Sequence, residues 1–453
     1  MKLDNDIFKQ NTQLTTVDIS SNYLTKTPYF GNLIHLNRLD IQDNPLTDIN
    51  NNDLAKLSTF TVVYTSQHEI CECFVPPNIS CSAADNRSPY LSCGRLLSDK
   101  ALATMMWFIG INALAGNIFV LSWRKRGKKK ASQKNKVQDL LLSNLAMSDL
   151  LMGVYMLLIA SADVYFGDYF PMQSETWRTG ITCRIAGALS LLSSEASVFF
   201  VTIISTDRFV CIKYPHISKT LKTRICYIAV TLTWLIAAVI GIVPSALSGI
   251  NFKFYDNSHV CIGLPLSLIH LYSSTELTKK ICPDTGSCYE VPLLITESGP
   301  LVSGLYFSSA IFLGLNCICY LAILACYIEV VRVVYKSSKR AGLNKEMKEQ
   351  MRLTFKVAAI VATDFACWFP VIVLGILVQA RVLTLPPSVY AWCVTFVLPI
   401  NSAINPYLYT IAAIISFRRK QKIGDASTSH ADSLQQRADG LASRQVHTVQ
   451  TDD

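Results

Sequence analysis

Charged residues are scarce in this chain, and long runs without them are common. Only 16% of its 453 residues are charged, 51% are hydrophobic, and the mean hydropathy is positive. This composition excludes an ordinary soluble domain and indicates a polytopic membrane protein. Seven apolar stretches can cross the roughly 30 Å hydrocarbon core as helices, which predicts an all-α seven-transmembrane helix bundle. The candidate spans cover residues 100–123, 138–166, 181–211, 224–246, 299–334, 353–379 and 388–412.

Other absences exclude several classes of membrane protein. No lysine lies between Arg381 and Arg418, so the last span cannot form the Schiff base of a retinal protein. The spans show neither the internal repeats nor the paired broken helices typical of transporters, which argues against an ion path through Asp149, Asp364 and Glu195. The His and Cys residues lack metal-ligand spacing. We therefore expect no enzyme, no such metal site and no nucleic-acid partner, and we interpret Glu195 as a buried hydrogen-bonding acid.

The basic residues predict the topology. The net charge is +9, and a dense basic run, RKRGKKKASQKNK at residues 124–136, follows the first span. Further basic clusters follow the third, fifth and seventh spans, whereas the intervening loops hold few cations. The basic side is therefore cytoplasmic and the N-terminus is extracellular, which predicts a multi-pass plasma membrane protein. We interpret the basic runs mainly as topology signals and contacts to membrane lipids, with partner binding as the alternative.

Cysteine usage agrees with this topology. Eight of the fifteen cysteines lie on the extracellular side, where an even number predicts disulfides, and the other seven are predicted to be free thiols. Cys261 is the predicted partner of Cys183, while Cys282 and Cys288 can close a small loop between themselves. A hinge at residues 71–99 contains four more, whose pairing the sequence leaves open: Cys71, Cys73, Cys81 and Cys93. The hinge also carries glycosylation sequons at Asn78 and Asn86.

Leucine-rich repeats precede the hinge, in residues 1–70. Four positions recur after 22 residues and match the repeat pattern, so we predict a partial α/β solenoid ectodomain: Leu14, Val17, Ile19 and Asn22, then Leu36, Leu39, Ile41 and Asn44. On its concave face Asp18 and Asp40 would be neighbours, with Arg38 and Gln42 alongside, an acidic spot suited to a basic ligand. The alternative is a solvated polar face. Residues 1–10 are polar and contain no signal peptide, so we expect further sequence upstream.

Polar residues deep in the spans are the candidate functional residues. A carboxylate at the bilayer centre costs roughly 2.5–3.5 kcal/mol, so Asp149 must face the bundle. Ser197, Asn401 and Asn405 are its predicted neighbours, and together they could hold a sodium ion or water. The alternative is a protonated acid that the amides hydrogen-bond without any ion.

The sixth and seventh spans contain predicted hinges. Pro370 removes a helix hydrogen bond beside Trp368, with Asp364 one turn below, and Pro406 follows Asn405 in the last span. Each could also be a purely architectural kink. After residue 423 the chain is polar and predicted to be a disordered cytoplasmic tail, 424–453. The stretch before it, 414–423, lacks a cysteine for palmitoylation.

These motifs, in this order, resemble the rhodopsin-like G protein-coupled receptors over about residues 100–422. The matching segments are Gly116-Asn117, Asp149 in LSNLAMSDLL, Cys183, Asp207-Arg208-Phe209, Trp234, CWFP at 367–370 and NPYLY at 405–409. The leucine-rich ectodomain is similar to that of the leucine-rich-repeat-containing receptors. Within these, SSEASV at 193–198 and TDFACWFP at 363–370 most resemble the relaxin receptor branch, including its invertebrate members.

The resemblance implies a role for each matching residue. Arg208 would be the cytoplasmic switch, restrained by Asp207 and received by Tyr327 and Tyr409 when the sixth span swings outward. Trp368 would act as the toggle of the hinge. The chain departs from the common pattern at Phe209, where tyrosine is usual, and at Asp207, where the relaxin branch generally has Glu. Asp364 replaces the usual phenylalanine, as in the glycoprotein hormone and relaxin receptors, and the fifth span lacks the common proline.

The predicted function is that of a receptor for a peptide or protein hormone, with a relaxin-like ligand as a candidate. It would relay binding to a heterotrimeric G protein, with arrestin as a further intracellular partner. A nonsignalling leucine-rich-repeat adhesion or decoy receptor is the alternative, favoured by Phe209 and the short ectodomain.

Overall fold

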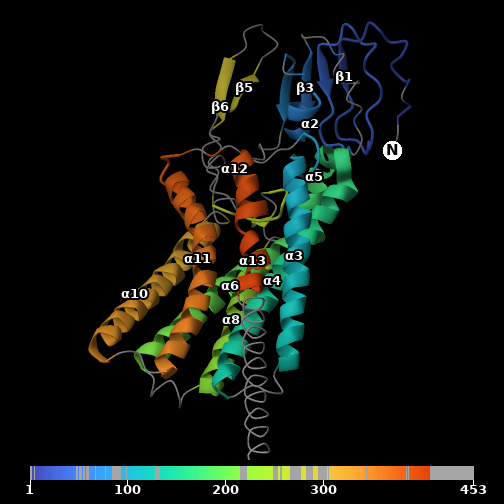
Figure 1. Ribbon diagram of the computed structural model, residues 1–453. Coiled ribbons are helices and arrows are strands. Elements are labelled where there is room, and N and C mark those ends of the chain that lie inside the picture. Colours follow the sequence, from blue (N-terminus) through green and yellow to red (C-terminus); the bar gives the residue numbers. More distant parts are fainter. Residues whose placement is uncertain are drawn as a thin grey trace, which may run out of the picture.

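The computed structural model resolves a helical bundle with a small strand region at one end (Figure 1). The described residues are 3–4, 6–46, 49, 54, 57, 61–66, 68–76, 78–83, 93–97, 99–127, 133–214, 222–247, 254–255, 258–265, 277–281, 289–293, 304, 306–341, 345–383, 385 and 387–408. The predicted fold class, a helical membrane bundle with a repeat ectodomain, is confirmed.

A four-stranded parallel sheet forms the ectodomain. Its strands are β1 (Thr16–Asp18), β2 (Arg38–Asp40), β3 (Val62–Thr65) and β4 (Ser80–Ala83), paired in sequence order. The side chains of Val17, Leu39 and Val63 point inward from successive strands. They belong to a hydrophobic core that is separate from the core of the helices. Asn44 fixes the turn after its strand, because its Nδ2 donates to the carbonyls of Ile19 (2.9 Å) and Gln42 (3.0 Å). The repeat asparagine thus satisfies turn backbone groups that would otherwise be buried without partners.

The first part of the predicted hinge completes the solenoid. Helix α2 (His68–Cys73) follows β3, and β4 then pairs with β3 as the last strand of the sheet. Cys71 bonds to Cys81 and Cys73 bonds to Cys93, which settles the pairing that the sequence left open. The second disulfide ties helix α2 to the residues that lead into the bundle.

Long apolar helices form the bundle. They are α3 (Lys100–Gly127), α4 (Gln133–Phe166), α6 (Ile181–Lys213), α8 (Lys222–Leu247), α10 (Asn316–Ala341) and α11 (Lys345–Gln379). A π-helical segment, η6 (Ser309–Leu315), precedes α10 in the fifth span. A short 3-10 turn, η2 (Gly167–Tyr169), and helix α5 (Phe170–Thr179) connect α4 to α6 on the outer side, where α5 packs beside α2.

Six helices in the described part of the chain are long and apolar enough to span a membrane. The seventh predicted span is broken into α12 (Pro387–Trp392), a π-helical segment η7 (Cys393–Val397) and α13 (Ile400–Pro406), which follow one another in Figure 1. Pro399 supplies no backbone N–H, so the helix is interrupted there. The outer connection between α8 and η6 carries an antiparallel hairpin, β5 (Leu277–Ile281) and β6 (Tyr289–Leu293).

Candidate functional site: a polar network inside the bundle

Asp149 lies fully buried on α4 and accepts hydrogen bonds from two other helices. Asn405 Nδ2 donates at 2.9 Å and Ser402 Oγ at 3.0 Å, both from α13, and Ser197 Oγ of α6 lies at 3.5 Å. Three donors around one carboxylate offset the cost of removing it from water. Ser402 was not among the residues predicted from the sequence.

The structure corrects the predicted partner of Asn401. This side chain donates to Asp364 of α11, and no hydrogen bond to Asp149 is recorded for it among the described residues. Asp364 also accepts from the Tyr320 hydroxyl of α10 at 2.7 Å. The buried polar groups therefore form two neighbouring clusters, one around each carboxylate. The Asp364 cluster joins three helices, α10, α11 and α13.

Small residues and amides bring α3 against α13. Asn117 Nδ2 donates to the carbonyls of Ala113 (2.8 Å) and Ser402 (3.0 Å) and so bridges the two helices. A Cβ atom on Gly116 would lie 2.9 Å from Pro406 Cγ, so only glycine permits this approach. The Gly116-Asn117 motif therefore fixes the position of the helix that carries Ser402 and Asn405.

A small cavity lies beside the Asp364 cluster. Its wall includes Ser193 and Ser197 of α6, Asp364 and Trp368 of α11, and Asn401 of α13. It can hold about one water molecule or a monatomic ion. Phe312 of η6 lines the same cavity, and so does Ile262 of the connection between α8 and η6, which we call the second outer loop. The Phe312 and Trp368 rings stack with centroids 6.1 Å apart. Trp368 and the kink at Pro370 within α11 therefore adjoin the polar network.

Two buried acceptor oxygens suit a cation. The Oδ1 atoms of Asn401 and Asn405 are buried and make no hydrogen bond within the described part of the structure. Both amides use their Nδ2 groups on the carboxylates of Asp364 and Asp149. Carboxylate, amide and hydroxyl oxygens are the ligands of hard cations. No group of three or more His, Cys, Asp or Glu side chains arranged for a metal occurs among the described residues.

Asp207 and Arg208 form an ion pair at the cytoplasmic end of α6. Arg208 is buried, and both its Nε (3.1 Å) and its Nη2 donate to Asp207 Oδ2. The Tyr327 hydroxyl of α10 is buried and lies close to Ser205 and Arg208. Tyr409 lies outside the described residues. The arginine is thus held by Asp207, with the Tyr327 hydroxyl close by.

Glu195, also on α6, is fully buried and pairs with α10. Asn316 Nδ2 donates to Glu195 Oε1 at 3.2 Å, immediately after the π-helical segment η6. The pair links the third and fifth spans above the level of Arg208. This arrangement agrees with the interpretation of Glu195 as a hydrogen-bonding acid.

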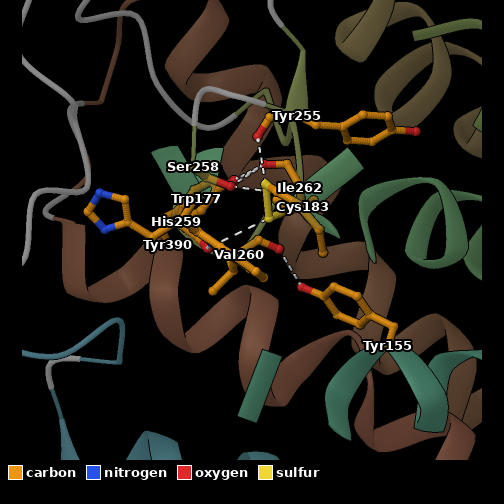
Figure 2. Close-up of a disulfide and its surroundings, with 10 residues drawn as sticks. Tyr155, Trp177, Cys183, Tyr255, Ser258, His259, Val260, Ile262 and Tyr390 are labelled. Atoms are coloured by element: carbon orange, nitrogen blue, oxygen red, sulfur yellow. Dashed lines mark hydrogen bonds between the residues drawn. A yellow bond between two sulfur atoms is a disulfide. The ribbon is translucent and has the colours of Figure 1, made fainter. Parts of the chain in front are cut away.

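The second outer loop enters the mouth of the bundle around the disulfide between Cys183 and Cys261 (Figure 2). Tyr155 donates to the Val260 carbonyl at 2.8 Å and Tyr390 to the Ile262 carbonyl at 2.6 Å. These bonds hold the loop backbone, which has no regular secondary structure of its own here, so that its buried carbonyls are satisfied. The loop thereby places Ile262 in the wall of the cavity.

His259 lies buried in the same loop. Its ring and that of Phe170 pack edge to face with centroids 4.8 Å apart, and its carbonyl accepts from Trp177 Nε1 at 2.8 Å. Burial, with a smaller contribution from the charge of Arg178, lowers the pKa of His259 from 6.5 to about 3. Burial likewise raises the pKa of Tyr255, whose hydroxyl donates to the Gly241 carbonyl. Both loop side chains are therefore neutral at physiological pH.

The concave face of the repeats carries one open acid rather than two. Asp18 and Asp40 are register neighbours, as predicted. Asp40 is buried and pairs with Arg38 at 3.1 Å, and it also accepts from the Gln42 backbone N–H. Asp18 is exposed, and hydrogen bonds from the Ser20 hydroxyl and backbone lower its pKa. The acidic character of this face therefore comes from Asp18.

The remaining predicted sites divide between exposed and undescribed residues. Asn78 is exposed in the hinge, as a glycosylation acceptor needs to be. Asn86, Cys282 and Cys288 lie outside the described residues.

Comparison with known proteins identifies the family. Residues 116–267 and 260–409 match the family described as 7 transmembrane receptor (rhodopsin family), and the chain belongs to it. It is therefore a multi-pass plasma membrane protein with an extracellular N-terminus, as predicted.

Three relatives place the chain among the leucine-rich-repeat-containing receptors. It is 32% identical over 350 residues to the G-protein coupled receptor GRL101 of Lymnaea stagnalis, covering 77% of this chain and 28% of that protein. It is 28% identical over 352 residues to relaxin receptor 1 of Rattus norvegicus, covering 77% and 41%. It is 27% identical over 322 residues to the thyrotropin receptor of Ovis aries, covering 70% and 36%. The chain thus spans less than half the length of each of these relatives. The predicted resemblance to the relaxin receptor branch is confirmed.

Proposed function

We propose that the chain forms the signalling part of a G protein-coupled receptor for a peptide or protein hormone, with a relaxin-like ligand as a candidate. The ion pair between the buried Arg208 and Asp207 is the observation that carries the proposal. Arg208 is held by Asp207 and lies close to the Tyr327 hydroxyl, which offers it an alternative partner. Hormone binding outside would favour that arrangement only through a difference in affinity between the two states. A heterotrimeric G protein, and then arrestin, would read the result inside.

The ectodomain supports a protein ligand. Asp18 offers an exposed negative charge. Arg38 lies on the next strand, where it pairs with Asp40, and Gln42 follows in the turn after that strand. We propose that this face binds a basic segment of the hormone. Relaxin and thyrotropin receptors, by their names, respond to hormones of protein nature, which supports the same class of ligand here.

A sodium ion is proposed for the polar network. Asp149, Asp364 and the free oxygens of Asn401 and Asn405 would hold it, with Ser197 nearby. The ion would stabilise the resting arrangement by screening two carboxylates. The thermal stability of the purified receptor should then be higher in sodium chloride than in choline chloride, and Asp149→Asn should remove the difference. Equal stability in both salts would exclude the site.

The test of the function is G protein activation without and with a hormone. Arg208→Ala should lower nucleotide exchange on heterotrimeric G proteins at least tenfold, with Arg381→Ala, at the outer end of the bundle, as the matched control. Candidate hormones of the relaxin class would be added to the full chain at equal surface expression. Undiminished exchange by Arg208→Ala would count against this mechanism. Absence of exchange by the wild type on every G protein would instead favour the adhesion or decoy receptor, which Phe209 in place of tyrosine keeps open.

A further inference from the structure

A short segment of the hinge is packed into the transmembrane bundle. Leu96 and Leu97 are buried and belong to the hydrophobic core of the helices, not to the core of the repeats. Leu97 lies just before α3 begins at Lys100. The segment Cys93–Leu97 is therefore one place where the ectodomain meets the bundle.

Asp163, near the outer end of α4, holds this segment in place by bonding to the backbone of Leu97 and to the side chain of Arg95. The residue is 2% exposed, and its Oδ1 accepts the backbone N–H of Leu97 at 2.9 Å. Its Oδ2 pairs with Arg95 Nη2 at 3.2 Å, and the same guanidinium nitrogen donates to the Asp163 carbonyl at 3.3 Å. A buried carboxylate needs such partners, because without them its charge would be removed from water uncompensated. We call Arg95, Leu96, Leu97 and Asp163 the hinge clasp.

The clasp is connected to the solenoid on one side. The disulfide between Cys73 and Cys93 joins it to α2, the helix that follows β3. Helix α2 also packs beside α5 on the outer side of the bundle, as the upper part of Figure 1 shows. A movement of the solenoid is therefore delivered through a covalent bond only two residues from Arg95.

On the other side, the clasp borders the aromatic cluster that supports the second outer loop. Phe166 lies one helical turn after Asp163 on α4. The centroid of its ring lies 5.9 Å from that of Phe170 and 5.5 Å from that of Trp177. Trp177 donates to the His259 carbonyl, and His259 precedes by two residues the disulfide cysteine Cys261. Ile262, next in sequence, lines the cavity with Trp368. Packed and bonded side chains thus connect Asp163 with the toggle tryptophan.

We propose that Asp163 is a positioning residue that holds the receptor in its resting arrangement through the hinge clasp, and that hormone binding acts by loosening this clasp. The proposal rests on the proposed function. The clasp is formed in the same structure in which Asp207 holds Arg208, so it belongs to the resting side of the equilibrium. Contacts that the active arrangement lacks would stabilise the resting arrangement alone, so that loosening them shifts the population toward the active one.

The test combines a structural and a functional measurement on the full chain. Asp163→Ala removes both interactions, whereas Asp163→Asn keeps an acceptor for the Leu97 N–H and loses only the charge. Asp168→Asn changes an exposed carboxylate at the same end of the bundle and is the matched control. Deuterium exchange of peptides covering residues 93–97 reports on the clasp, and hormone-free nucleotide exchange on G proteins reports on the equilibrium.

We expect Asp163→Ala to speed deuterium exchange in this segment and to raise hormone-free G protein activation about fivefold. Asp163→Asn should give a smaller rise than Asp163→Ala, and Arg95→Ala should give the same rise as Asp163→Asn. The double variant Asp163→Asn/Arg95→Ala should show no further rise, because both changes remove the same ion pair. Asp168→Asn should change neither measurement. Unchanged deuterium exchange in Asp163→Ala would refute the clasp itself. Faster deuterium exchange without a rise in G protein activation would refute its resting-state role, provided that the wild type activates a G protein and Arg208→Ala does not. If the wild type also fails to activate any, the proposed function is what fails, while the deuterium exchange still tests the clasp.

Discussion

Replacing Asp364 with leucine leaves two buried donors without an acceptor. The Tyr320 hydroxyl and the Asn401 amide both bond to this carboxylate, and they come from α10 and α13, on either side of α11. An unsatisfied buried donor costs about 1–3 kcal/mol. In the proposed activation, an outward movement of α11 would let water reach both donors, so that this cost would apply mainly to the resting arrangement. A net bias of about 1.4 kcal/mol raises the active population tenfold while that population is small.

The measurement is hormone-free nucleotide exchange on a panel of purified heterotrimeric G proteins, normalised to the amount of folded receptor. Tyr320→Phe and Asn401→Ala each remove one donor, and a net hydrogen bond of about 0.5–1.5 kcal/mol predicts two- to tenfold rises. Thr363→Val is the control, because the Thr363 hydroxyl bonds only to carbonyls of its own helix, Ala359 and Ile360. If Asp364→Leu exchanges nucleotide at the wild-type rate, the three-helix tie does not restrain activation.

Three further predictions concern the stability of the bundle. The receptor should lose stability as the pH falls from about 6.5 toward 3, because the unfolded chain protonates His259 before the folded one does, and His259→Phe should flatten this dependence in thermal unfolding. Replacing Cys183 and Cys261 together by alanine should cost about 2–4 kcal/mol, seen as a loss of surface expression and melting temperature. Gly116→Val should cost about 1–3 kcal/mol, because its side chain would collide with Pro406, and Gly94→Ala is the control, since nothing lies near its Cβ position.

Each of these has an outcome that would refute it. A pH dependence that persists in His259→Phe would assign the lost stability to another group. Unchanged melting without the outer disulfide would mean that hydrogen bonds alone hold the loop. Equal stability of the Gly116 and Gly94 variants would show that α3 can move away from Pro406 at no cost.

The sequence predicted the spans well because lipid imposes one requirement on all of them. A helix that satisfies its own backbone and carries few charges is recognisable without knowledge of its neighbours. The burial of Asp149 followed from the same reasoning, as did its neighbour Asn405.

The neighbours of the two amides in the seventh span were harder to predict. Successive residues of a helix differ in direction by about 100°, so Asn401 and Ser402 face different helices. The π-helical segment η7 and the break at Pro399 change the phase of everything after them. A regular helix drawn through the span gives no means of deciding which of the two faces Asp149. Asn401 donates to Asp364 of the neighbouring helix, because two carboxylates share the hydrogen-bond donors of this span.

Apart from the disulfide between Cys183 and Cys261, the contacts of the loops could not be predicted from the sequence. In the sequence, Asp163 is one of several polar residues near the end of a span. Its bond to the Leu97 backbone N–H depends on the path of the hinge against the bundle. The hydrogen bonds from Tyr155 and Tyr390 to the second outer loop likewise join residues far apart in the chain. Such long-range contacts depend on the folded path of irregular segments, which no periodic pattern encodes.

The inserted second outer loop has a consequence for drug discovery. Ile262 shares a cavity with Trp368, and the loop that carries it is fastened by Gln379, which donates to the Pro265 carbonyl at 2.9 Å, and by Tyr390. A compound arriving from outside therefore competes with a piece of the receptor's own polypeptide. Suitable compounds for screening are those that can bind beneath the loop or occupy the position of the Ile262 side chain. Agonists and inverse agonists would then differ in whether they move that loop out of the bundle or hold it in place.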